Sequence, residues 1–247
     1  MWTTISASIR WFARLLAAIL RFLWWLAHAS ADRLEKQACA SCDEPLRRRA
    51  LWCQLCSVSV LPAPPGIGAD ASPASHAFGL YGGALADALQ RLKYRQRPDL
   101  ARRLGLLVSQ QLGPTLSGWP DVVVAVPLHP RRLARRGFNQ AALLARPIAE
   151  GLAVALDSTS LERVIDTAPQ ATLDGEQRRR NMHGAFVVRD RTRVAGKRVL
   201  LIDDVATTGA TLAACESALR HAGAVDVRAL VVACAGSHRQ RVDHFRV

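Results

Sequence analysis

Acidic side chains are scarce in this sequence. Its 247 residues include 20 Asp and Glu against 33 Lys and Arg, which gives a formal net charge of +13 and an isoelectric point near 10.8. Such a balance indicates polyanionic partners, such as nucleic acid, phosphorylated metabolites or anionic lipid. Chance enrichment in Arg on a soluble surface gives the same composition, so the charge does not choose among these partners.

Cysteine is too sparse for a disulfide-stabilised protein of this length. The chain has 6 cysteines, and four of them form two CxxC pairs, Cys39 with Cys42 and Cys53 with Cys56. Two such turns complete a tetrahedral Zn²⁺ shell, so we expect a structural zinc site. Redox-active or merely buried cysteines are the alternatives, although redox chemistry requires only one pair. We also expect a reducing compartment and therefore a cytoplasmic protein.

Long uninterrupted apolar runs are missing from the N-terminal segment. At about 100° per residue, Arg10, Arg14, Arg21 and His28 fall on one narrow stripe of a helix that is otherwise apolar. These arginines leave no stretch of the roughly 18 uncharged residues that a membrane span requires. We expect residues 1–36 to form an amphipathic helix that lies on the inner membrane surface or packs on a partner. A signal peptide and an extension upstream of the true start are the alternatives.

Three further regions follow this segment. Residues 37–60 hold the zinc-binding cysteines, residues 61–77 are a linker rich in proline and small residues, and residues 78–247 have an α/β pattern. Buried strands are expected at 122–126, at 199–202 and near 225–236, with a short strand and turn at 76–83. Helical spacing is expected over 84–94, 100–112, 141–156 and 212–222. Pro147 should kink the third of these helices or end its first part.

The most informative stretch, Val199–Thr211, reads VLLIDDVATTGAT. A buried strand runs into Asp203 and Asp204, and a small, hydroxyl-rich turn then leads into a helix. A helix N-terminus at the end of a parallel strand suits a phosphate, whereas ionised carboxylates repel phosphate and suit sugar hydroxyls. The pattern therefore favours a ribose 5-phosphate. The residues expected around the phosphate are Ala206, Thr207, Thr208, Gly209, Ala210 and Thr211. The alternatives, a solvated acidic turn or a Mg²⁺-binding carboxylate pair, do not need the TTGAT turn.

Two polar segments complete the ligand-facing side of the domain. A cationic loop after the 122–126 strand could hold a pyrophosphate through guanidinium groups and backbone N–H groups. Its candidate residues are Arg131, Arg132, Arg135, Arg136, Gly137 and Asn139. A two-stranded excursion from 161 to 188 frames a polar loop with the form of a lid that excludes water. The candidate lid residues are Gln170, Arg179, Arg180 and Asn181. Plain surface basicity and an ordinary hairpin tip are the alternatives.

Taken together, these motifs resemble the ComF family, the competence protein F and amidophosphoribosyltransferase-like group. The resemblance covers nearly everything from Cys39 onward. The segments that carry it are the CxxC pairs, LKY at Leu92–Tyr94, VPLHPRRLARRGFNQA from Val126, the loop from Gln170 to Asn181 with GAF after it, and LLIDDVATTGAT. In combination they are far more specific than any one motif alone.

The resemblance implies a type I phosphoribosyltransferase fold, a parallel sheet with helices on both faces and a hood. A small zinc-binding module and the amphipathic helix would precede it. The ligand would be phosphoribosyl pyrophosphate with Mg²⁺. By the same resemblance, Asp203 and Asp204 would be the catalytic pair that holds the ribose hydroxyls, Thr207–Thr211 would hold the 5′-phosphate, and the arginine loop would face pyrophosphate.

The resemblance leaves the activity open. The family link is to DNA uptake in natural transformation, and an active protein would be a pentosyl-transferring enzyme with an unidentified acceptor. The alternative is a non-catalytic scaffold of the same fold that binds single-stranded DNA or senses nucleotides. Against DNA binding, the basic loops lack interleaved aromatic residues for base stacking, with Phe138 alone beside the arginines. Membrane-associated assembly, with contacts to the uptake machinery, is a third reading that rests on residues 1–36.

Overall fold

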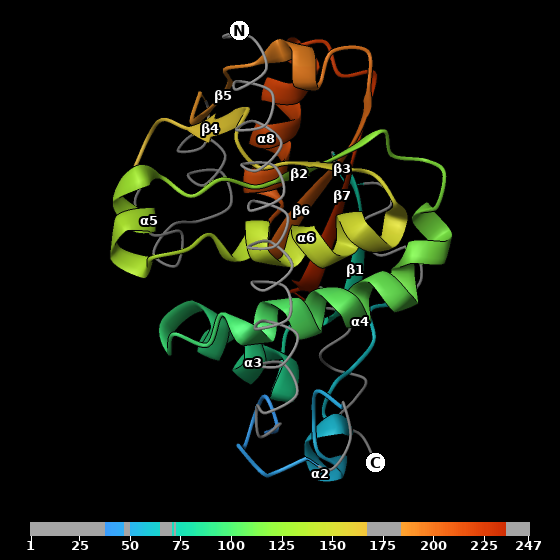
Figure 1. Ribbon diagram of the computed structural model, residues 1–247, viewed down its shortest axis with the longest axis vertical. Helices are drawn as coiled ribbons and strands as arrows, with labels where there is room; N and C mark the ends of the chain where they lie inside the picture. Colours follow the sequence, from blue (N-terminus) through green and yellow to red (C-terminus); the bar gives the residue numbers. More distant parts are fainter. Residues whose placement is uncertain (1–37, 47–49, 65–70, 72, 167–183, 236–247) are drawn as a thin grey trace, which may run out of the picture.

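A computed structural model describes residues 38–46, 50–64, 71, 73–166 and 184–235 (Figure 1). The helix expected over residues 1–36 lies outside these ranges. So do the four candidate lid residues, Gln170, Arg179, Arg180 and Asn181. Within the described ranges, no helix combines the length and the apolar character that a membrane span requires.

A five-stranded parallel sheet forms the centre of the protein, with the strand order β1-β7-β6-β2-β3. Its strands are β1 (Ala74–Leu80), β2 (Val122–Ala125), β3 (Ala155–Asp157), β6 (Arg198–Ala206) and β7 (Asp226–Cys234). The residues of β2 are all buried, because helices cover both faces of the sheet and a parallel strand then needs apolar side chains on both sides. The strands expected from the apolar runs are confirmed.

The helices connect these strands in chain order. Between β1 and β2 come α3 (Gly83–Tyr94) and α4 (Asp99–Leu116), and between β2 and β3 come α5 (Pro130–Arg136) and α6 (Gln140–Leu152). Helix α8 (Ala210–His221) joins β6 to β7. The helical run expected to continue to residue 156 ends earlier, because Ala153 adopts a left-handed conformation with φ of 56° and the chain then enters β3.

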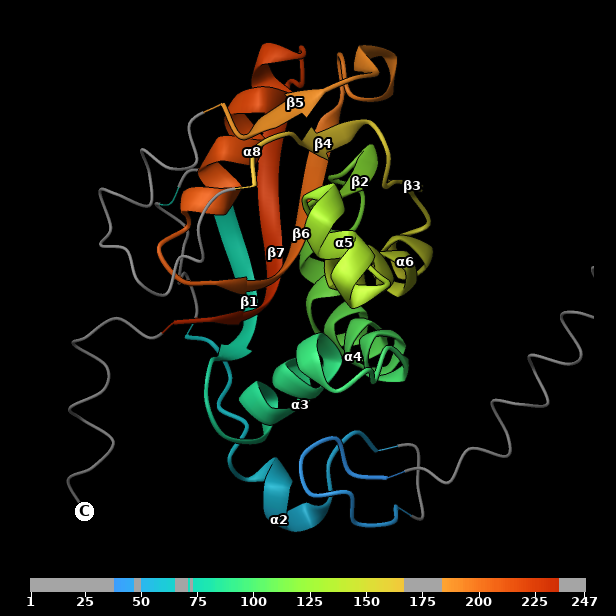
Figure 2. The same cartoon turned by 90° about the vertical axis from the view of Figure 1, so that its left-hand side faces the viewer.

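The two faces of the sheet carry different helices. Strand β2 leads outward to β3, whereas β6 leads in the opposite direction to β7. Right-handed crossovers that run in opposite directions place their helices on opposite faces, so α4 and α6 cover one face and α8 covers the other (Figure 2). The boundary between β6 and β2 is therefore the topological switch point, where ligands bind in open α/β sheets.

Helices α4 and α6 approach closely at a glycine. A Cβ atom built on Gly105 would lie 2.4 Å from Cγ of Pro147 and 2.8 Å from the carbonyl oxygen of Leu144. Pro147 lies inside α6, which continues to Leu152, so the proline does not end the helix. Its ring instead fills the space that the missing side chain of Gly105 leaves.

A two-stranded antiparallel unit stands beside α8. Strands β4 (Leu161–Arg163) and β5 (Phe186–Val188) pair as the sequence predicted for the 161–188 excursion (Figure 1). The guanidinium of Arg163 lies over the ring of Phe186 at 5.6 Å. A short 3₁₀ helix, η2 (Arg191–Arg193), then leads back to β6.

The cysteine module packs directly on α3 and α4. It contains the short helix α2 (Gln54–Ser57). Trp52 is buried, and its indole N–H donates to the carbonyl oxygen of Ala84 at 3.1 Å. Arg103 of α4 donates to the carbonyl oxygens of Ala38 and Ala50 at 3.1 and 2.5 Å. Part of the segment expected as a linker also belongs to the sheet domain, because β1 begins at Ala74 and residues 61–63 bond to its edge.

Candidate ligand site and metal centre

Two polar segments leave the sheet side by side at the switch point. The N–H of Val126, just after β2, donates to the carbonyl oxygen of Ile202 in β6 at 2.9 Å. Strand β6 ends at Ala206, the turn follows, and α8 starts at Ala210. Gly209 makes this turn with φ of 73°, a left-handed conformation that favours glycine. Among the described residues Gly209, the N-cap of α8, makes no side-chain capping bond, and a helix N-terminus at the end of a parallel strand suits an anion.

Asp203 and Asp204 are consecutive residues of β6, so their side chains leave the strand on opposite faces. Asp204 faces α3, where its Oδ2 lies 2.8 Å from Nζ of Lys93. Asp203 is 8% exposed, and its Oδ1 accepts a hydrogen bond from the Asp204 N–H at 2.8 Å. The structure thus brings the two carboxylates together, both buried, but it directs them differently.

Burial, reinforced by the neighbouring charge of Asp204, raises the pKa of Asp203 to about 8. For Lys93 burial alone would lower the pKa, but the Asp204 carboxylate more than compensates and raises it. The ammonium of Lys93 therefore stays charged beside Asp204.

The Asp203→Asn variant is expected to be more stable than the wild type at pH 8, with a smaller difference at pH 4. Folding raises the pKa of Asp203 from its ordinary value of 3.8. The contribution of this carboxyl to the free energy of unfolding is therefore fully present below pH 4, and it is lost as the pH rises toward 8. Asn does not titrate, so its gain at pH 8 should be about 1–3 kcal/mol, the usual penalty of an imperfectly satisfied buried polar group. Urea unfolding at both pH values measures the difference.

Asp121→Asn is the matched control, because the contribution of Asp121 to the free energy of unfolding should change with pH in the opposite direction. Hydrogen bonds from the Arg198 side chain and backbone lower the pKa of Asp121 to about 2. Its contribution is therefore present above pH 4 and is lost as the pH falls toward 2. A stability change in Asp203→Asn that is the same at pH 4 and pH 8 would contradict the raised pKa.

The arginine segment expected as a loop contains the short helix α5. Pro130 takes the first helical position, where its missing N–H costs nothing. His129 precedes it, and its Nδ1 accepts a hydrogen bond from the N–H of Arg131 at 3.3 Å. Gly137, with φ of 83°, ends the helix. Arg131 and Arg135 are exposed on this helix.

Three other residues of this segment make contacts within the protein. Arg132 donates to Oδ1 of Asp166 at 3.2 Å, and Arg136 donates to Oε1 of Gln140 at 2.6 Å. Asn139 caps α6 by accepting from the N–H of Ala141, and its Nδ2 donates to the carbonyl oxygen of Val126 at 3.0 Å. Asn139 therefore fixes the path of the segment rather than offering its side chain to a ligand.

Lys93, Tyr94 and Arg163 lie at this site, although the sequence had assigned them no role. The Arg136 guanidinium lies 5.5 Å from the centroid of the Tyr94 ring, which places an aromatic residue beside the arginines. Burial lowers the pKa of Arg163, and Asp203 lies close enough to act on it by charge. The LKY motif was the sequence signal for the first two residues, but only the packing of α3 shows what they contact.

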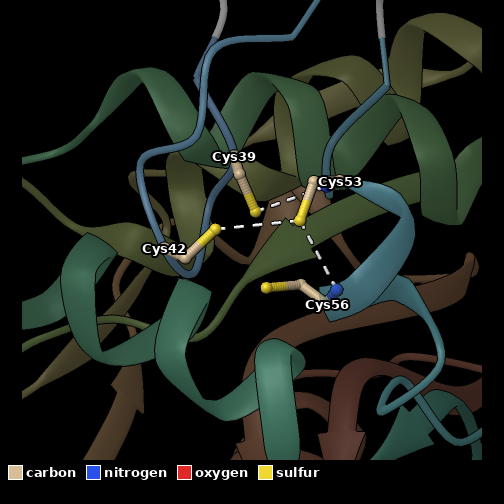
Figure 3. Close-up of side chains that lie close together, drawn as sticks. All are labelled: Cys39, Cys42, Cys53 and Cys56. Atoms are coloured by element: carbon tan, nitrogen blue, oxygen red, sulfur yellow. Dashed lines mark hydrogen bonds between the residues drawn. The ribbon is translucent and has the colours of Figure 1, made fainter.

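The four cysteines of the paired CxxC turns form one cluster (Figure 3). Their sulfur atoms all lie within 4.8 Å of one another, with Sγ of Cys42 and Sγ of Cys53 3.7 Å apart. Burial would raise the pKa of the Cys39 thiol, but hydrogen bonds, chiefly from the backbone N–H groups of Cys42 and Cys53, lower it to about 6. The four sulfur atoms converge, and the thiol of Cys39 ionises more easily than an ordinary cysteine. The cluster is therefore able to hold a metal ion, as expected from the sequence.

Comparison with known proteins finds one family model and several curated relatives. The phosphoribosyl transferase domain matches residues 109–247. The DNA utilization protein YhgH of Salmonella typhimurium is 33% identical over 222 residues, 88% of this chain and 93% of that protein. YhgH of Escherichia coli K12 is 33% identical over 202 residues, 80% and 84% of the two chains. Competence protein F of Haemophilus influenzae is 32% identical over 156 residues, 61% and 68% of the two chains. The family match contains both ligand-facing segments.

Proposed function

This chain belongs to the phosphoribosyl transferase family, in its ComF group of competence and DNA-utilization proteins, and we propose that it binds phosphoribosyl pyrophosphate with Mg²⁺. One observation carries the proposal. The phosphate turn with its two carboxylates and the arginine helix α5 leave neighbouring strands at the switch point of a type I phosphoribosyltransferase fold.

Each part of the ligand has a matching group in this site. The 5′-phosphate would accept hydrogen bonds from the first N–H groups of α8 and from the exposed Thr207 and Thr208. The ribose hydroxyls would donate to Asp203 and Asp204, and the pyrophosphate would face the exposed Arg131 and Arg135. The lid residues between 170 and 181 stay a prediction.

The same arrangement suits group transfer at the anomeric carbon. Loss of pyrophosphate develops positive charge on the ribose ring, and a carboxylate beside the ring stabilises that charge. Mg²⁺, bound with the pyrophosphate, would neutralise the leaving group. Pyrophosphate release, measured across bases, amines and ammonia, would identify an acceptor. If the ligand binds and no acceptor supports turnover, the protein binds phosphoribosyl groups without transferring them.

Asp204→Asn is expected to weaken the binding of phosphoribosyl pyrophosphate by roughly tenfold to a hundredfold. A hydrogen bond to a charged group contributes about 1.5–3 kcal/mol, and Asn presents one amide in place of a carboxylate. Isothermal titration calorimetry with Mg²⁺ present measures the change. The matched control is Asp226→Asn at the opposite end of the sheet, where the carboxylate pairs with Arg220. The proposal fails if the wild type does not bind, or if both variants lose affinity equally.

The names of the relatives suggest the wider role. We place this protein in DNA uptake, with a structural Zn²⁺ in the Cys39, Cys42, Cys53 and Cys56 cluster. All six cysteines are free thiols, which suits a reducing cytoplasmic location. If uptake depends on the ligand, natural transformation should fall in a strain that carries only Asp204→Asn. Strongly salt-dependent binding of single-stranded DNA by that same variant would instead support the non-catalytic alternative.

A further inference from the structure

Helix α3 lies between the cysteine module and the ligand site (Figure 2). On the module side, Asp87 accepts a hydrogen bond from the Ser41 hydroxyl at 2.6 Å, and Arg91 pairs with Asp43 at 2.5 Å. The last two residues of α3, Lys93 and Tyr94, contact the ligand site. One helix therefore joins the two functional parts of the protein.

The contact between Lys93 and Asp204 is largely shielded from water. The Lys93 side chain is 20% exposed and the Asp204 side chain 5%. Within the described ranges, the Lys93 ammonium, 2.8 Å away, is the partner found for Oδ2 of Asp204. An ammonium that holds one oxygen of a carboxylate also sets the direction of the other oxygen.

The neighbouring residue contacts the other ligand-facing segment. The Tyr94 ring is 73% exposed and lies under the guanidinium of Arg136, the last residue of α5. The C-terminal end of α3 therefore contacts both Asp204 in β6 and the arginine helix α5 after β2. A shift of α3 would displace both contacts together, and the cysteine module, packed on its other side, restrains that shift.

We propose that Lys93 is a positioning residue of the ligand site, which orients the Asp204 carboxylate for the ribose hydroxyls while the cysteine module holds α3 in place. This inference rests on the proposed function. It assigns a role to a residue that precedes the 109–247 family match. Its consequence is selective, because Lys93 would affect ligands that contain ribose and leave the binding of pyrophosphate alone unchanged.

Lys93→Met tests this inference, because Met keeps much of the length and apolar character of the side chain without its charge. We expect its affinity for phosphoribosyl pyrophosphate with Mg²⁺ to fall about tenfold, which is about 1.4 kcal/mol, and its affinity for inorganic pyrophosphate to stay unchanged. In an Asp204→Asn background the same substitution should cause little further loss, since coupled residues are not additive. Lys93→Arg should retain most of the affinity.

Two further variants separate positioning from folding. Lys197→Met is the matched control, since Lys197 lies just before β6, at the opposite end of the strand from the ligand site, and its ammonium donates to the backbone oxygen of Arg193 at 2.9 Å. Arg91→Met leaves Lys93 intact but removes the link from α3 to Asp43. It should lower affinity for phosphoribosyl pyrophosphate severalfold with no change for pyrophosphate.

The inference is overturned if Lys93→Met weakens pyrophosphate binding as much as phosphoribosyl pyrophosphate binding, because Lys93 would then contact the pyrophosphate directly. It is also overturned if the loss persists in the Asp204→Asn background. A wild type that binds neither ligand would reject the proposed function itself, and that result differs from both of these. If Lys93→Met does not fold, Arg91→Met decides the question: unchanged affinity for phosphoribosyl pyrophosphate in that variant rejects the inference.

Discussion

Replacing Cys39 and Cys53 together with alanine is expected to abolish metal binding and to unfold the cysteine module. Purified wild type should carry one zinc ion per chain and the double variant none. Together the two substitutions remove one sulfur ligand from each CxxC turn, and the two ligands that remain cannot complete a tetrahedral shell. Structural zinc contributes about 10–16 kcal/mol of apparent binding energy in small zinc peptides, so little else would hold a module of this size together. Elemental analysis and thermal unfolding measure the two effects.

Cys234→Ala is the matched control for this experiment. Cys234 is a buried free thiol in β7, outside the cluster, so its replacement should leave the zinc content unchanged. Loss of the module should also expose Trp52, which packs against α3, and tryptophan fluorescence should report this change. Retention of one equivalent of zinc by the double variant would contradict the assignment of the cluster as a metal site.

Gly105→Ala is expected to destabilise the protein by about 1–3 kcal/mol or more, the usual cost of overpacking a core. An added Cβ would come within 2.4 Å of the Pro147 ring and 2.8 Å of a backbone oxygen in α6, so the two helices would have to move apart. This cost opposes the gain of about 1 kcal/mol that alanine brings to a helix interior over glycine. Chemical denaturation measures the free energy of unfolding.

Gly113→Ala, in the same helix, separates helix propensity from packing. A Cβ there would meet only the Ser109 hydroxyl, at 3.8 Å, so the variant should be neutral or more stable by up to about 1 kcal/mol. Opposite signs at Gly105 and Gly113 would show that the close approach of α4 and α6 depends on the missing side chain. Equal effects at the two positions would contradict this account.

Features encoded in contiguous residues could be predicted from the sequence. The strand, carboxylates and turn of Val199–Thr211 occupy adjacent positions, so local chain geometry alone brings them together. The same holds for each CxxC turn and for the 161–188 hairpin, whose strands pair as expected. The type I phosphoribosyltransferase fold followed from the combination of these motifs.

Other features depend on neighbours that are distant in the chain. Helix α6 ends at Ala153, where the chain turns into β3, and it continues unbroken through Pro147, whose ring packs against Gly105. Helical periodicity in the sequence does not indicate either of these features. In the arginine segment, the sequence predicted a loop after the strand that stops at Pro127. The helix signals Pro130 and Gly137 were nevertheless present in the sequence, at the two ends of α5.

The sequence by itself determined which groups this protein offers to the proposed phosphoribosyl ligand and to a metal ion, because those groups lie within short motifs whose spacing sets their geometry. Only the tertiary structure decided how Asp203 and Asp204 divide between the two faces of the sheet and which partners they meet. The reason is physical: a buried carboxylate takes its orientation from the charges packed around it. For Asp204 that charge is Lys93, brought there by α3 from a distant part of the chain.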